Sequence, residues 1–199
     1  MHTIRFLARP LLSLFFSLET KGLEDLPSDS AYILLPKHQR WEDIPLLALA
    51  VPRPLYYMAK QELFMLPVAG WFMASMGGVP VHRTRPISTR DSLRAMAAYL
   101  EKGEGIVIFP EGTYYRNALG PGHLGLVRRV HSRFDVPFVP AGITYRVGYR
   151  RTSVRIHIGK PLNGRDFSSA WELLDRVMSE IGRLSGLERP DGSDGGVGG

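Results

Sequence analysis

The sequence predicts an α/β fold: a largely parallel central sheet flanked by helices. A chain of 199 residues has the size of one domain, and 44% of its residues are hydrophobic, which is enough to bury a core. Short apolar runs alternate along the chain with segments of helical periodicity. Such alternation is typical of strands joined by crossover helices, which produce a parallel sheet.

Six short apolar runs have the composition of strands. β-Branched and aromatic residues are frequent in them, and turn residues lie between them. The expected strands are Tyr32–Leu35, Leu55–Met58, Val79–Val81, Gly105–Phe109, Phe138–Ile143 and Val154–Ile158.

Helical periodicity occurs between these runs. In the segment that ends near Glu101, apolar residues recur on one face and Gly103 follows the end, as at a helix C-terminus. The last such segment has Trp171, Leu174 and Met178 at helical spacing, which indicates a face packed on the core. The expected helices are Ile44–Ala50, Leu66–Met76, Thr89–Glu101, Leu124–Phe134 and Ser168–Leu184.

The N-terminus is predicted to form an amphipathic helix over residues 1–19. Polar residues recur every four positions and form one stripe along it: Arg5, Arg9, Ser13 and Ser17. Leucine and phenylalanine side chains occupy other parts of the helix surface. A basic helix with exposed apolar side chains lies flat in a membrane interface, and packing of its apolar side chains on the protein's own core is the alternative.

A second apolar stretch, Leu63–Val81, carries no charged residue. Helix-breaking residues interrupt it: Pro67, Gly77, Gly78 and Pro80. Only Leu66–Met76 suits a single helix, which would be about 16 Å long at about 1.5 Å per residue. Because the hydrocarbon core of a bilayer is about 30 Å thick, we expect a buried or partly lipid-dipping helix here and not a membrane span.

The charge and composition of the chain limit its function. The net charge of +6 and the pI near 9.8 predict a surface that prefers anions. The absence of Cys excludes disulfides, thiolate nucleophiles and zinc–thiolate sites. No metal-ligand spacing, phosphate-binding Gly-Lys-Ser/Thr loop or nucleophile elbow is present, so neither a metal site nor a cofactor is expected. Residues 186–199 are rich in Gly and Asp and are expected to be disordered.

The first segment with catalytic potential contains His38 and Asp43, which lie five positions apart between an expected strand and an expected helix. On one continuous helix the two side chains would not meet. In a strand–turn–helix, Asp43 reaches back to one imidazole nitrogen of His38, fixes the tautomer and raises the basicity of the other nitrogen. The alternative is that Asp43 caps the helix, with Pro45 in its first turn. Asp43 can also serve both roles.

Three further segments lie at expected strands. Gly105–Thr113 runs from a buried strand into a turn where backbone amides can approach an anion and Glu111 can orient a polar partner; an ordinary Pro–Gly turn is the alternative. Gly77–Arg83 ends on an arginine that can bind a phosphate through two parallel hydrogen bonds, or can simply be solvated. Val136–Gly142 by itself indicates only a strand edge with two prolines.

Taken in order, these four segments resemble the lysophosphatidic acid acyltransferase family, the PlsC-like glycerolipid acyltransferases. The family's H-x4-D block is matched by His38 and Asp43, and its F-P-E-G-T block is matched letter for letter by Phe109–Thr113. Its Gly-led strand that ends in Arg is matched by Gly77–Arg83, and its V-P-x-x-P block by Val136–Pro140. The ordered set of four blocks is more specific than any one of them.

The resemblance implies a glycerolipid-acyltransferase-like fold, with the acyltransferase domain at residues 20–185. It also implies transfer of a fatty-acyl group from acyl-CoA or acyl-carrier protein to the free hydroxyl of 1-acyl-glycerol-3-phosphate, in phospholipid biosynthesis. By the family's pattern, His38 is the general base and Asp43 orients it. The residues expected to bind the acceptor are Lys60, Arg83, Glu111, Gly112, Thr113 and Arg116.

The expected partners are therefore a membrane lipid surface, an acyl thioester donor and a phosphorylated glycerolipid acceptor. The expected location is the cytoplasmic face of a membrane, in a peripheral or monotopic arrangement.

Three departures from the family's pattern all concern the acceptor. Tyr114 stands where Arg usually follows F-P-E-G-T, which leaves Arg116 as a substitute. Gly122-His123 stand where Phe-Lys is usual, and Pro80 replaces an aromatic residue.

Two other functions remain open at this point. One is the same chemistry on another acceptor: glycerol phosphate, another lysolipid or an amino-lipid. The other is a non-catalytic module that binds anionic membrane. Nucleic-acid binding is not expected, because neither a recognition helix nor an aromatic–basic RNA signature is present. Arginines suited to an anionic membrane are frequent in the second half of the chain: Arg128, Arg129, Arg133, Arg146, Arg150, Arg151 and Arg155. They would equally suit the phosphates of CoA or an acidic carrier protein.

Overall fold

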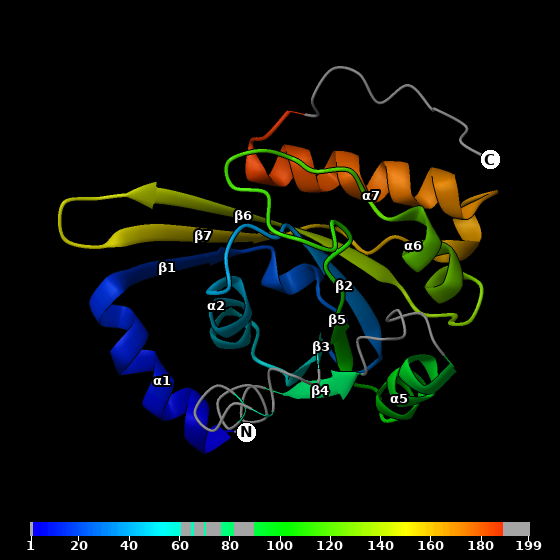
Figure 1. The fold of residues 1–199 in the computed structure, drawn as a ribbon, viewed down its shortest axis with the longest axis horizontal. Coiled ribbons are helices and arrows are strands. Elements are labelled where there is room, and N and C mark those ends of the chain that lie inside the picture. Colours follow the sequence, from blue (N-terminus) through cyan, green and yellow to red (C-terminus); the bar gives the residue numbers. More distant parts are fainter. Residues whose placement is uncertain (1, 61–64, 66–69, 71–76, 82–89, 189–199) are drawn as a thin grey trace.

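A seven-stranded sheet forms the centre of the molecule, in the strand order β1-β7-β6-β2-β5-β3-β4 (Figure 1). The computed structural model describes residues 2–60, 65, 70, 77–81 and 90–188. Neighbouring strands are parallel except for β6 and β7, so the predicted largely parallel sheet is confirmed. The strands are β1 (Phe16–Lys21), β2 (Tyr32–Pro36), β3 (Leu55–Lys60), β4 (Gly78–Val81), β5 (Gly105–Val107), β6 (Phe138–Val147) and β7 (Thr152–Ile158).

Helices connect and cover these strands. The helices are α1 (His2–Phe15), α2 (Asp43–Ala50), α5 (Arg90–Leu100), α6 (Leu124–His131) and α7 (Ala170–Ser185), with short 3-10 helices at Leu23–Asp25 and Gly164–Asp166. The helix expected over Leu66–Met76 lies outside the described residues, except for Gly70. Within the described part of the chain, no helix is both long enough and apolar enough to cross a membrane.

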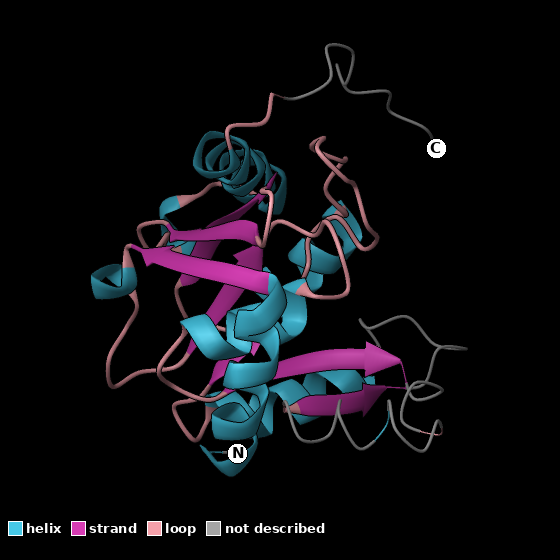
Figure 2. Ribbon diagram, turned by 90° about the vertical axis from the view of Figure 1, so that its left-hand side faces the viewer, coloured by secondary structure: helices cyan, strands magenta, loops and turns pink. Residues whose placement is uncertain are grey.

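The sheet is covered on both faces. Tyr32 and Leu34 of β2 pack in a cluster with residues of α2, whereas Ile33 and Leu35 pack in a second cluster with residues of α5, α6 and α7. Successive residues of a strand point to opposite faces, so β2 contributes to both cores and all of its residues are buried. Figure 1 shows α7 and α2 on opposite sides of the sheet, and Figure 2 shows how strongly the strands twist across it.

The first strand differs from the prediction of a helix over residues 1–19. The helix α1 ends at Phe15, and the next residues form β1, which pairs in parallel with β7 at the edge of the sheet. In β1, half-buried and exposed residues alternate with a period of two, as in a strand with one covered face. The hydrogen bonds to β7, a strand more than 130 positions later in the chain, decide between helix and strand here.

The pair β6–β7 is longer than the sequence predicts. The two strands pair with each other from Ala141 and Ile158 out to Val147 and Thr152, so they extend each other beyond the expected end of β6 at Ile143. The C-terminal tail, expected to be disordered from residue 186, begins with an ordered cap: Gly186 adopts a left-handed conformation that ends α7, and Leu187 packs on the core. The tail from residue 189 onward lies outside the described residues.

Candidate active site

His38 and Asp43 meet at the end of β2. His38 lies in the turn that follows this strand, and Asp43 is the first residue of α2. The imidazole Nδ1 lies 3.0 Å from Asp43 Oδ2, so the predicted contact between the two side chains is present. His38 is 8% exposed and Asp43 is fully buried. The turn therefore places a His–Asp pair at the carboxyl end of a central parallel strand, where sites in α/β sheets lie.

Asp43 is held by the residues around the turn. Its Oδ2 accepts hydrogen bonds from the backbone amides of Gln39 (2.6 Å) and Arg40 (2.8 Å), and its Oδ1 accepts one from the Tyr145 hydroxyl (2.6 Å). The residue in the cap position is Glu42, which makes no side-chain capping bond. The carboxylate of Asp43 thus orients the turn before α2, and it does not cap the helix.

The hydrogen bond to Asp43 determines which nitrogen of His38 carries the proton. A carboxylate only accepts, so Nδ1 donates and Nε2 keeps its lone pair. The ring is also held from its sides: it stacks on Phe109 with centroids 3.6 Å apart and meets Tyr114 at 4.4 Å. Among the described residues, Nε2 has no hydrogen-bond partner. The imidazole is therefore fixed in place with one basic nitrogen available.

A buried ion pair lies directly behind His38. Lys37 Nζ lies 2.9 and 2.7 Å from the two carboxylate oxygens of Glu111, and both side chains are fully buried. The ammonium also donates to the backbone carbonyls of His38 and Tyr115, at 3.0 and 2.8 Å. Burial lowers the pKa of Lys37 below its usual value, and the hydrogen bond to Glu111 opposes that shift.

Glu111 joins the turn that carries His38 to the loop that follows β5. Its Oε2 accepts from the backbone amide of His38 at 2.9 Å, and its Oε1 accepts from that of Gly120 at 2.7 Å. The sequence predicted that Glu111 binds the acceptor. Its side chain is fully buried, however, and its carboxylate is hydrogen-bonded to Lys37 and to the backbone of His38 and Gly120. Its contacts position the backbone of the site.

Gln39 makes a second connection between the same elements. Its amide nitrogen donates to the carbonyl of Ile143 on β6 at 2.6 Å, and its amide oxygen accepts from the backbone of Asn117 at 2.9 Å. The Tyr115 amide also donates to the carbonyl of His38 at 3.0 Å. These hydrogen bonds hold the loop over residues 110–120 against the turn that carries His38.

The remaining predicted site residues lie around this core. Gly112, Thr113 and Arg116 are exposed on the loop after β5. Gly112 has φ 67°, and a Cβ on it would lie 2.6 Å from the His123 ring. The backbone of Lys60 ends β3 at the same edge of the sheet as His38, two strand spacings or about 10 Å away along the sheet. Arg83 lies outside the described residues.

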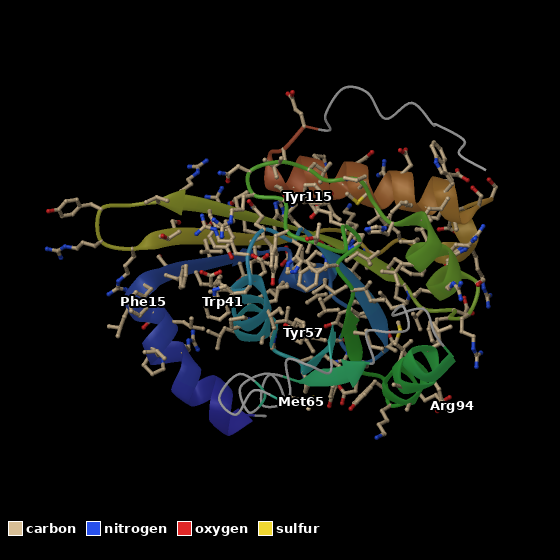
Figure 3. All side chains as sticks on the ribbon, in the orientation of Figure 1. Phe15, Trp41, Tyr57, Met65, Arg94 and Tyr115 are labelled. Atoms are coloured by element: carbon tan, nitrogen blue, oxygen red, sulfur yellow. The ribbon has the colours of Figure 1, made fainter. Side chains whose placement is uncertain are left out.

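Two exposed aromatic side chains lie next to the His–Asp pair. Trp41 sits in the turn between His38 and Asp43, and Figure 3 shows it near the start of α2. Tyr114 occupies the place where the family usually has Arg, and it contacts the His38 ring. Burial raises the pKa of Tyr114, and the charges of Asp43 and Glu42 raise it further. Within the described part of the chain, no group of His, Asp and Glu side chains forms a metal site.

Sequence reasoning missed three residues of this arrangement: Lys37, Gln39 and Tyr145. A signal for Lys37 exists, because it follows a buried strand and Glu111 follows the neighbouring one, which puts opposite charges at adjacent strand ends. Tyr145 had no such signal, since it lies beyond the expected end of its strand. Its contact with Asp43 depends on how far β6 extends past β2.

The fold and this site define a class of protein. A family model described as Acyltransferase matches residues 17–144, which is more than half of the chain, and the chain belongs to that family. A chloroplastic 1-acyl-sn-glycerol-3-phosphate acyltransferase of Brassica napus is 32% identical to it over 184 residues, covering 87% of this chain and 52% of the relative. The chain thus spans about half the length of that relative.

Two further proteins resemble the chain over most of its length. A lyso-ornithine lipid O-acyltransferase of Pseudomonas aeruginosa is 29% identical, over 94% of this chain and 71% of that protein. The crystal structure of the 1-acyl-sn-glycerophosphate (LPA) acyltransferase, PlsC, from Thermotoga maritima matches with a TM-score of 0.75 and 25% identity, over 93% of this chain and 78% of that one. The glycerolipid-acyltransferase-like fold expected from the sequence is therefore confirmed.

Proposed function

We propose that the protein is an acyltransferase that moves a fatty-acyl group from acyl-CoA or acyl-carrier protein to the free hydroxyl of 1-acyl-glycerol-3-phosphate. The observation that carries this proposal is the contact between His38 Nδ1 and Asp43, which leaves Nε2 as a fixed base. The relatives from Brassica napus and Thermotoga maritima are named for this acceptor, and they support its choice.

In the proposed mechanism, His38 Nε2 removes the proton of the acceptor hydroxyl as its oxygen attacks the thioester carbonyl. Asp43 stabilises the positive charge that forms on the imidazole, as the buried carboxylate of a protease triad does. The tetrahedral intermediate then collapses, the carbon–sulfur bond breaks, and the imidazolium returns its proton to the leaving sulfur. No nucleophilic side chain is required, because the acceptor itself brings the hydroxyl.

We further propose that the protein works at the cytoplasmic face of a membrane, in a peripheral arrangement, because its substrates are lipids. In α1, Leu11, Leu14 and Phe15 are each about three-fifths exposed, at 62%, 62% and 61%. Exposed apolar side chains on a helix with a basic residue, Arg9, favour an interfacial position.

The test is an assay of the free thiol released from the acyl donor, with a panel of acceptors. The chain has no Cys, so the protein contributes no background. We expect thiol release that requires 1-acyl-glycerol-3-phosphate and falls by about 10²–10⁴-fold in His38→Ala. His157→Ala, a half-buried histidine on β7, is the matched control. Turnover that persists in His38→Ala, or thiol release without an acceptor, would rule the proposal out.

A second acceptor class is favoured by Tyr114. This tyrosine lies against His38 where the family usually has Arg, and an arginine there can bind a phosphate whereas a tyrosine carries no charge to pair with it. The relative named for a lyso-ornithine lipid supports an amino-lipid acceptor. The same panel distinguishes the two: an amino-lipid enzyme would use a lyso-amino-lipid better than 1-acyl-glycerol-3-phosphate, and Tyr114→Arg would shift the ratio toward the phosphate. A non-catalytic membrane module would release no thiol with any acceptor of the panel.

A further inference from the structure

The hairpin that joins β6 to β7 carries an exposed group of cationic and apolar side chains. Val147 is 83% exposed and Tyr149 is fully exposed. Arg146, Arg150 and Arg151 are exposed beside them, and no acidic residue lies between positions 146 and 152. We call residues 146–151 the hairpin tip.

The arginines of the hairpin tip have no charge partner among the described residues. Within the described part of the chain, none of the three forms an ion pair. On the neighbouring strand β1, Glu19 is already paired with Arg155 of β7 and with Lys21, at 2.9 and 3.4 Å. The hairpin tip therefore presents three positive charges with no carboxylate of the described protein to neutralise them, and these charges are available to an anionic partner.

The sheet register brings the end of α1 to the same place. Phe16 pairs with Thr152, and Thr152 pairs with Val147. The start of β1, the start of β7 and the end of β6 therefore lie side by side. Phe15, the last residue of α1, directly precedes β1, and Figure 3 shows it below the hairpin. The exposed Phe15 of α1 thus lies at the same end of the sheet as the hairpin tip.

The hairpin tip also lies beyond the active-site end of the sheet. Pro36, the last residue of β2, pairs with Ala141, and β6 continues past it to Val147. Along that extension Tyr145 binds Asp43, and Val147 lies two residues farther, about 7 Å at about 3.3 Å per residue. A surface that contacts the hairpin tip would therefore lie close to the His–Asp pair.

We propose that the hairpin tip is a docking site for an anionic lipid surface, and that it holds the active site at the headgroup layer. Arginine pairs with anionic headgroups, whereas valine and a tyrosine ring suit the boundary between headgroups and acyl chains. An acidic protein would match the three arginines but would leave Val147, Tyr149 and the apolar side chains of α1 without an apolar partner. The role for catalysis rests on the acyltransferase function proposed above; the lipid binding itself does not.

The test measures binding of the full chain to sedimenting vesicles of phosphatidylcholine, with and without phosphatidylglycerol. Arg150→Glu/Arg151→Glu should weaken binding to the anionic vesicles by at least about tenfold, since two charges that attract anionic headgroups become two charges that repel them. Val147→Ser/Tyr149→Ser should weaken binding to both kinds of vesicle. The matched control is Arg128→Glu/Arg133→Glu, which makes the same charge change near α6 at the other end of the sheet (Figure 1).

Equal losses in the hairpin and control variants, or wild-type binding by Arg150→Glu/Arg151→Glu, would overturn the proposal. So would wild-type vesicle binding together with weaker binding to acyl-carrier protein, which would assign the hairpin tip to an acidic protein. Acyl transfer is measured separately: the hairpin variants should keep wild-type rates with a water-soluble short-chain acceptor and lose rate with a vesicle-bound one. If no acceptor supports transfer but the binding difference remains, the proposed function fails and the docking site stands.

Discussion

The Lys37 ammonium lies 2.7 Å from Glu111 Oε2, and this ion pair joins the ends of two neighbouring strands beneath His38. Neither side chain reaches the surface. The pair holds the backbone of His38 on one side and that of Gly120 on the other. Glu111 belongs to the F-P-E-G-T block, so the position of that block relative to His38 depends on this contact.

Lys37→Met should therefore lower both stability and activity. Removing one partner leaves the Glu111 carboxylate buried without its cation, which costs about 3–5 kcal/mol in the free energy of unfolding. Urea unfolding measures this loss in the free energy of unfolding, and Lys160→Met, at an exposed position, is the control. Lys37→Met/Glu111→Leu should lose less than the sum of its two single variants; additive losses would show that the two charges are not coupled.

Asp43→Asn should lower kcat by about 10²–10⁴-fold while the protein stays folded. An amide in place of the carboxylate can donate to Nδ1, which would move the imidazole proton to Nε2 and remove the base. The measurement is the thiol-release assay together with a thermal unfolding curve. Asp166→Asn, at an exposed position in the short 3-10 helix after β7, is the control. Full activity in Asp43→Asn would contradict the role given to this residue.

Tyr145→Phe should change how stability depends on pH. Burial and the Asp43 carboxylate raise the pKa of Tyr145 above its ordinary value of 10.0, so above that pH the unfolded chain releases this proton while the folded chain keeps it. The wild type therefore loses stability as pH rises past about 10, by up to about 1.4 kcal/mol per pH unit from this group. The Phe variant lacks this loss.

The prediction is tested by urea unfolding of wild type and Tyr145→Phe between about pH 8 and about pH 11, because an unperturbed tyrosine titrates near 10. At the lower pH the wild type should be more stable than the variant, because of its hydrogen bond to Asp43, and the difference should shrink above about pH 10. Tyr149→Phe, at the exposed hairpin tip, is the matched substitution. A difference that stays constant with pH would contradict the account of Tyr145.

Gly112→Ala should be destabilising, because this glycine has φ 67° and a Cβ would lie 2.6 Å from the His123 ring. The left-handed conformation alone costs about 1–2 kcal/mol for a residue with a Cβ. Adding His123→Ala should recover only the part due to the contact. Gly125→Ala in α6, where a Cβ meets nothing within 4 Å, should instead leave stability unchanged or raise it. Equal effects at the two glycines would contradict this reasoning.

The sequence by itself determined the class of fold and the contact between His38 and Asp43. Apolar runs such as Tyr32–Leu35 are recognisable without a structure, because a strand buried on both faces has no polar residues to place. The contact between His38 and Asp43 was also predictable, since it spans five positions across one strand–turn–helix. Both inferences rest on sequence patterns that are local in the chain.

The tertiary structure decided what depends on partners far apart in the chain. β1 is a strand and not the end of a helix because β7 supplies its hydrogen bonds. Glu111 holds the backbone of His38 and Gly120, and it is buried there because the end of β2 brings Lys37 to it. Tyr145 reaches Asp43 only because β6 extends past β2. A hydrogen bond or an ion pair forms only at contact distance, and strand register, which no local pattern in these segments specifies, sets those distances.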